Sequence, residues 1–194
     1  MRYVSAYVSN PSSTRTERVV LLLDDGTNAS LVSEELAKKL ELTGTATMIS
    51  LALGGGQIYK TPGYYSKIKI KGTMPYQGMK VFEKMTHVKI LPNPTGKVAV
   101  LDWNQYKRYW PHLKDIDFPI LPEDRRIMGI IGTKDNDLLN GIAPVVVADN
   151  ISDAPSAKRT VLGWTAIGRV LPAEVRASEI MTSDCHYLYD CAET

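Results

Sequence analysis

An unbroken apolar run near the start of the chain ends in two acidic residues and a turn. The run covers residues 19–23, and Asp24, Asp25, Gly26 and Thr27 follow it directly. A buried strand can be this apolar, but folding alone gives no reason for a carboxylate at its end. Carboxylate oxygens accept hydrogen bonds and exchange protons. The order of these residues therefore indicates a function at this turn.

Three consecutive glycines, Gly54, Gly55 and Gly56, form the second unusual stretch. Glycine supplies turn conformations in an ordinary hairpin, and it also lets a backbone approach a ligand closely. The sequence leaves these two interpretations equally open. A phosphate-binding loop is disfavoured, because neither a lysine-hydroxyl pair nor a helix start follows at the required spacing.

The chain offers few residues that could bind a metal ion. His87 has no acidic or cysteine neighbour, and Cys185, His186 and Cys191 supply one ligand fewer than a structural zinc site needs. We therefore expect no metal. Cys185 and Cys191 both lie in the last ten residues, so a disulfide between them would link only parts of the tail and would not stabilise the core. The two cysteines therefore favour a reducing compartment.

Length and charge bound the class of protein. The 194 residues are sufficient for one sizeable domain, and a net charge of +2 is too small to indicate nucleic acid or an anionic membrane as a partner. No apolar run approaches the roughly 20 residues that cross a bilayer, and the first residues lack the apolar core of a secretory signal. We expect a soluble, unprocessed chain.

The turn at Asp24 needs a framework that positions it, and the apolar pattern predicts mostly strands. A capped stretch at 33–40, with acids first and lysines last, predicts a short helix. Aromatic residues on one helical face over 102–110 are expected to lie in the core. The predicted strands cover residues 2–9, 19–23, 45–53, 64–71, 80–91, 127–132, 142–148 and 160–168.

The connections follow from polar and turn-forming residues. Residues 10–13 are predicted to turn the first strand back into the second, with 14–17 in solvent. Residues 135–139 are predicted to form one helical turn, and 149–158 a polar loop. On the strand 64–71, the alternating lysines are expected to form a solvated face and the two isoleucines between them a buried one.

Two stretches resemble the signatures of the retropepsins. Leu22-Leu23-Asp24-Asp25-Gly26-Thr27 is similar to the active-site loop of these aspartic peptidases, and Ile130-Ile131-Gly132 before a helical turn is similar to their second signature. Further stretches, 33–40, 110–113 and 160–164, resemble the protease region of BEL/Pao-type retrotransposon polyproteins. The resemblance covers residues 1–170 and leaves 171–194 as a C-terminal tail or spacer.

The resemblance implies both a fold and an activity. The fold would be mainly β, a retropepsin-like closed β-barrel with two or three short helices. Two copies would form a homodimer in which Asp24 of each chain activates a water, since this chemistry needs two carboxylates that share a proton. Gly54, Gly55 and Gly56 would form the tip of a flap over an extended peptide, and Gly132 would be the glycine of the second motif.

The role implied by the resemblance is the processing of a retroelement polyprotein, without a cofactor or a metal. The implied location is the cytoplasm, which includes virus-like particles. Neither a membrane nor nucleic acid is expected as a partner of this domain.

Asp25 departs from the family pattern. Retropepsins carry Thr or Ser at this position, whose hydroxyl both donates and accepts in a clasp between the two loops, whereas an ionised carboxylate only accepts. Two Asp24 and two Asp25 carboxylates near one axis would repel by about 3 kcal/mol per pair. We hypothesise that Asp25 is either protonated in the clasp or turned away from it, and that acid pH favours activity. The alternative function is a dimerisation or peptide-binding module with weak or no proteolysis.

Overall fold

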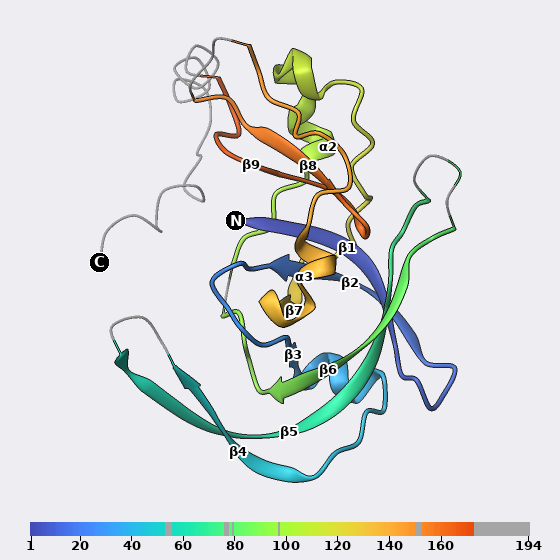
Figure 1. Cartoon of the computed structure of the whole chain (residues 1–194), viewed down its shortest axis with the longest axis vertical. Helices are drawn as coiled ribbons and strands as arrows, with labels where there is room; N and C mark the ends of the chain where they lie inside the picture. Colours follow the sequence, from blue (N-terminus) through green and yellow to red (C-terminus); the bar gives the residue numbers. More distant parts are fainter. Residues whose placement is uncertain (53–55, 76–77, 79, 97, 150–152, 173–194) are drawn as a thin grey trace.

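The fold is a closed β-barrel with a hairpin arm and a smaller sheet beside it. The computed structural model describes residues 1–52, 56–75, 78, 80–96, 98–149 and 153–172. Within these residues six strands close into a mixed barrel, which confirms the predicted mainly β closed barrel with a few short helices. The ring runs through β1 (Arg2–Ser9), β2 (Thr16–Leu23), β7 (Ile127–Ile131), β3 (Leu31–Ser33), β6 (Glu83–Leu91) and β5 (Ile58–Lys71), and β5 pairs again with β1 (Figure 1).

Asn10 fixes the turn between β1 and β2. Its side-chain oxygen accepts a hydrogen bond from the Ser12 N–H at 2.8 Å, in an Asx turn that favours asparagine at this position. Its amide nitrogen donates to the carbonyl oxygens of Leu40 and Glu41 at 3.0 and 3.1 Å. The predicted hairpin is confirmed, but β2 already begins at Thr16, because the ladder with β1 continues to the end of β1.

The helix α1 (Glu34–Lys39) packs on the core inside the barrel. Ser33 caps it, because the Ser33 Oγ accepts the Leu36 N–H at 3.2 Å. Leu36, Ala37 and Leu40 are fully buried and join the same core as the inward-facing residues of β1 and β2. Acidic residues in its first turn and lysines in its last favour the helix dipole, so the predicted helix is confirmed.

A second core lies on the outer side of β1 and β2. It is covered by α2 (Trp103–Tyr106), by the 3-10 turns η2 (Lys107–Tyr109) and η3 (Pro111–Leu113), and by the hairpin of β8 (Ser156–Thr160) and β9 (Gly163–Ile167). Trp103, Trp110 and Leu113 are buried there, which confirms that the aromatic stretch belongs to the core. Because of this covering layer, residues 3–6 of β1 are buried on both faces.

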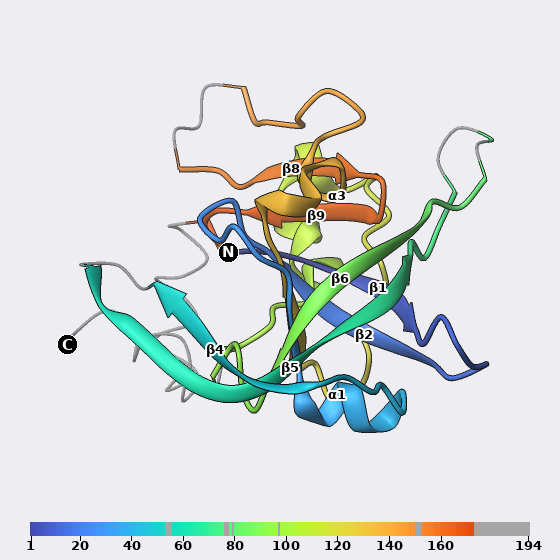
Figure 2. The ribbon, with the colours of Figure 1, turned by 60° about the horizontal axis from the view of Figure 1, so that its bottom comes forward.

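A hairpin arm extends from the barrel. β4 (Ala46–Ala52) pairs with the first half of β5, which begins at Ile58 and not at the predicted residue 64. Ile68 and Ile70 are fully buried in the barrel half of β5, as predicted for the face opposite the lysines. In Figure 1 and in Figure 2 the end of β4 and the start of β5 reach the same side of the barrel as the connection between β2 and β3.

The strand predicted for residues 142–148 is wrong. Only Val146 forms a bridge there, with β8, while Val145 and Val147 are 51% and 58% exposed. Pro144 has no N–H to donate to a ladder. The apolar residues of this stretch therefore do not form a buried strand.

The strand predicted for 160–168 is shorter than expected, because residues 163–167 form β9 and a tight turn precedes them. β8 and β9 form an antiparallel hairpin, so the predicted loop 149–158 ends where β8 begins at residue 156. Gly163 has a φ of +149°, which residues with a side chain rarely adopt. The Thr160 Oγ1 donates to the Gly163 carbonyl oxygen at 3.0 Å and closes the turn.

Candidate active site

Asp24 lies where β2 ends, and hydrogen bonds fix both its backbone and its side chain. Leu23 pairs in parallel with Ile131 at the end of β7, and the Asp24 N–H donates to the Ile131 carbonyl oxygen at 3.0 Å. The Asp24 Oδ1 accepts the Gly26 N–H at 2.9 Å. The turn therefore holds a half-buried carboxylate at the carboxyl ends of two parallel strands.

Gly132 follows β7 and packs closely against this turn. A Cβ atom at Gly132 would lie 2.5 Å from the Thr27 carbonyl oxygen and 2.6 Å from that of Ala29. The Thr133 N–H donates to the same Thr27 oxygen at 2.7 Å. The structure thus brings together the two stretches that the sequence singled out, 24–27 and Gly132.

A buried carboxylate that the sequence did not indicate supports the turn. Asp135, in the 3-10 turn η4 (Thr133–Asp135) before α3 (Asn136–Leu139), is 2% exposed. It accepts hydrogen bonds from Ser30 Oγ at 2.6 Å and Thr86 Oγ1 at 2.7 Å, and pairs with Lys84 Nζ at 3.1 Å. The Ser30 Oγ also accepts the Gly132 N–H at 3.3 Å. The network therefore ties the end of the Asp24 loop to β6 and to η4.

These hydrogen bonds keep Asp135 ionised. Burial opposes ionisation, but the hydrogen bonds from Ser30, Thr86 and Lys84 outweigh it and hold the pKa of the Asp135 carboxyl below its usual value. A carboxyl whose pKa is lower in the folded state adds stability above its unfolded pKa, about 4, and this contribution is lost as the pH falls through the folded value.

We expect Asp135→Asn to lower the free energy of unfolding by about 2 kcal/mol at neutral pH, because a buried, charge-assisted network is lost. The difference from the unchanged chain should shrink below about pH 4, where the unchanged chain also loses the contribution of this carboxylate. Urea unfolding at neutral pH and at about pH 3 measures both values.

Asp137 provides the matched control. It also pairs with Lys84, but its side chain is 52% exposed, so Asp137→Asn should cost less than about 0.5 kcal/mol. Equal losses for the two variants, or a difference that stays constant down to about pH 3, would contradict the role of Asp135.

Asp25, the second acid of the turn, faces a cation of its own chain. Its carboxylate forms an ion pair with the guanidinium of Arg2. The Arg2 side chain is 20% exposed and that of Asp25 is 57% exposed. Arg2 lies opposite Leu23 in the β1–β2 ladder, so the predicted hairpin contained the signal that could have identified it.

An apolar cluster connects the hairpin arm with the turn. Ile49 of β4 is fully buried in a cluster with residues of β3, β6 and β7. Leu22, Ala29 and Leu51 are partly buried and pack against this cluster. Partly exposed apolar side chains of β2, of the loop after Asp24 and of β4 therefore belong to one cluster.

Only part of the predicted flap tip is described. Gly56 has a φ of +79°, in the region that favours glycine. Gly54 and Gly55 lie outside the described residues. The flap therefore stays a prediction.

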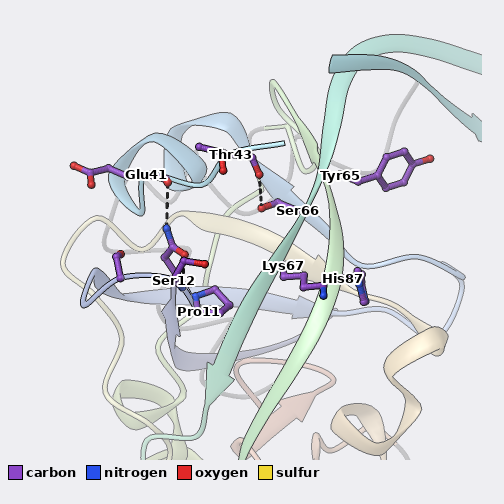
Figure 3. Close-up of a pocket in the computed structure, with 10 residues that line it drawn as sticks. Pro11, Ser12, Glu41, Thr43, Tyr65, Ser66, Lys67 and His87 are labelled. Carbon is purple, nitrogen blue, oxygen red and sulfur yellow. Dashed lines mark hydrogen bonds between the residues drawn. The ribbon is translucent and has the colours of Figure 1, made fainter. Parts of the chain in front are cut away.

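Three cavities on the described residues lie away from the turn. One of about 580 Å³ lies between the β1–β2 turn and the outer faces of β5 and β6, with Pro11 and Ser12 on one side and Lys67 and His87 on the other (Figure 3). The other two measure about 390 and 670 Å³. Residues 24–27 line none of the three.

The structure describes only part of the chain to which the metal and membrane predictions apply. Within the described ranges no three His, Cys, Asp or Glu side chains are grouped so that they could hold a metal ion. In the same ranges no helix has the length and apolar character needed to cross a membrane. Cys185, His186 and Cys191 lie outside the described residues, so the tail 171–194 and the boundary at 170 stay predictions.

The described geometry combines a fixed carboxylate turn, a closely packed glycine and a buried supporting network. No protein-family model, curated protein or solved structure matches this chain.

Proposed function

We propose that this chain is one half of a homodimeric aspartic endopeptidase of the retropepsin type, with Asp24 as its catalytic carboxylate. The observation that carries the proposal is the Asp24 turn. Asp24 is half-buried, its backbone N–H is hydrogen-bonded to Ile131, and the loop that follows it packs on Gly132. The two stretches that resemble the retropepsin signatures are adjacent in the fold, as such a site requires.

The chemistry explains why two chains would be needed. Peptide hydrolysis of this kind uses two carboxylates that share one proton, so Asp24 of a second copy would complete the site. The ionised carboxylate accepts a proton from a water molecule, which attacks the scissile carbonyl carbon. The protonated carboxylate donates to the carbonyl oxygen, and the tetrahedral intermediate then collapses as the leaving amine takes up a proton.

An extended peptide suits the surface beside the turn. Among the described strands β4 lies at the edge of the sheet, so the arm offers main-chain groups that are not paired with any described strand to a peptide that binds as an added strand. Leu22, Ala29 and Leu51 supply partly exposed apolar surface for its side chains. The proposed substrate is therefore a polypeptide.

The biological role that we propose is the processing of a retroelement polyprotein, and it rests on the resemblance over residues 1–170. The homodimer would act in the cytoplasm, which includes virus-like particles. Its partner there would be its own polyprotein, without a membrane or nucleic acid.

A dimerisation or peptide-binding module with weak or no proteolysis is the second candidate. The observation that favours it is Asp25, which pairs with Arg2 and does not offer the hydroxyl that retropepsins use in their clasp. This candidate predicts binding of the same extended peptides without turnover.

Incubation of the purified chain with a polyprotein fragment that spans its own borders tests both candidates. The peptidase should cleave the fragment, and its rate per chain should rise with the dimer fraction measured by sedimentation, because each site needs two copies. A strict monomer at all concentrations would contradict the peptidase. A dimer that binds the fragment without cleaving it would identify the binding module.

A further inference from the structure

We propose that Arg2 is a positioning residue of the catalytic turn, which cancels the charge of Asp25 and keeps this carboxylate paired outside the clasp. The inference rests on the proposed function, because its effect on catalysis requires two Asp24 carboxylates at one site. Of the two alternatives for Asp25, it selects the one in which the carboxylate is turned away.

The pairing of β1 with β2 in the barrel positions Arg2 beside the turn. In the β1–β2 ladder Arg2 lies opposite Leu23, the residue before Asp24. Most of the Arg2 side chain is covered, so packing orders it where its guanidinium meets the Asp25 carboxylate. Figure 1 and Figure 2 both show the N-terminus beside the connection between β2 and β3.

The charge of Arg2 also affects a lysine of the smaller sheet. Burial, and then the positive charge of Arg2, lower the pKa of Lys158 in β8. The positive charge of Arg2 therefore also acts on Lys158, and the Asp25 carboxylate that pairs with Arg2 offsets this charge.

Charge compensation matters because twofold symmetry doubles every charge at the site. Two copies would bring two Asp25 carboxylates close to two Asp24 carboxylates, and uncompensated negative charge would disfavour the ionised form of the Asp24 pair. With Arg2 bound, each Asp25 becomes part of a nearly neutral pair. The Asp24 pair is then singly protonated over a range of lower pH than it would be beside two unpaired carboxylates.

The test is the pH dependence of kcat/KM for variants of the full chain. Arg2→Gln should move the pH optimum of cleavage upward by about half a unit, because Asp25 is left as a bare negative charge. Asp25→Asn should move the optimum downward by about half a unit, because Arg2 is left as a bare positive charge. The double variant should return to within about 0.2 units of the unchanged chain.

Two further variants separate this role from packing. Arg2→Lys keeps the charge and should largely keep the optimum. Arg15→Gln removes a cation from the exposed Arg15–Glu41 pair at the opposite end of the same hairpin, and should leave the optimum unchanged because distant exposed charges are screened. Optima that do not move, or that move in the same direction for Arg2→Gln and Asp25→Asn, would overturn the inference.

A measurement without catalysis separates this inference from the proposed function. The measurement is a double-mutant cycle of urea unfolding with Arg2→Gln, Asp25→Asn and the double variant. Each variant raises the unfolding equilibrium constant by some factor. The factor for the double variant should be about threefold smaller than the product of the two single factors. Additive effects would overturn the inference. Coupling in a chain that cleaves no fragment would support the pairing of Arg2 with Asp25 and contradict the peptidase.

Discussion

Asp24→Asn is expected to lower kcat/KM for polyprotein cleavage by about 10³-fold or more, because an amide cannot hold or release the shared proton. The fold should remain intact. The asparagine oxygen can still accept the Gly26 N–H that Asp24 Oδ1 accepts at 2.9 Å. The free energy of unfolding should therefore change by less than about 0.5 kcal/mol. Cleavage kinetics and urea unfolding on the same preparation measure both effects.

Mixtures of chains sharpen this prediction. If every site needs two intact carboxylates, about a ninefold excess of Asp24→Asn chain should lower the activity per unchanged chain about tenfold, because most unchanged chains then pair with a variant. Asp117→Asn, at an exposed acid, is the matched control and should leave the activity as it is. Activity of Asp24→Asn above about a tenth of normal would remove Asp24 from the proposed mechanism.

Gly132→Ala is expected to lower the free energy of unfolding by about 3 kcal/mol, and to abolish cleavage where the chain is still folded. The added Cβ would meet the carbonyl oxygens of Thr27 and Ala29 at 2.5 and 2.6 Å. Neither oxygen can move away freely, because the Thr27 oxygen accepts the Thr133 N–H and Ser30 is bonded into the buried network. The turn that carries Asp24 must therefore shift.

Gly141→Ala is the matched control for this substitution. The nearest atom to a Cβ at Gly141 is the Cε of the flexible Lys158 side chain, at 3.1 Å, so a small movement relieves the contact. Its cost should stay below about 1 kcal/mol. Urea unfolding that gives equal losses for Gly132→Ala and Gly141→Ala would contradict the close packing of the turn. Normal cleavage by Gly132→Ala would contradict its link to the Asp24 turn.

The parts of the fold that the sequence predicted are those that local patterns encode. The Asn10 turn and the Ser33 cap each depend on side chains within a few positions of the backbone groups that they bind. The apolar run before Asp24 predicted a buried strand for the same reason. These features place the candidate carboxylate at the end of β2 before any tertiary contact is known.

The supporting residues could not be predicted because they depend on contacts between distant segments. Asp135 looked like the start of a helical turn, and only its meeting with Ser30 and Thr86 makes it a buried anchor. The strand predicted for 142–148 failed for the converse reason, because an apolar run becomes a strand only where another strand pairs with it. Arg2 is the exception, because the register of the predicted β1–β2 hairpin places it opposite Leu23 and so beside the turn.

The parallel pairing of β2 with β7 also sets the order of events during synthesis. Thr27 and Thr133 are 106 positions apart, and the bond between them forms only once both segments exist. A nascent chain can build the β1–β2 hairpin early, whereas closing so long a loop is slow. If the chain is the proposed peptidase, its site can form only after residues 133–135 have been synthesised, and a polyprotein that carries it could not cleave itself earlier.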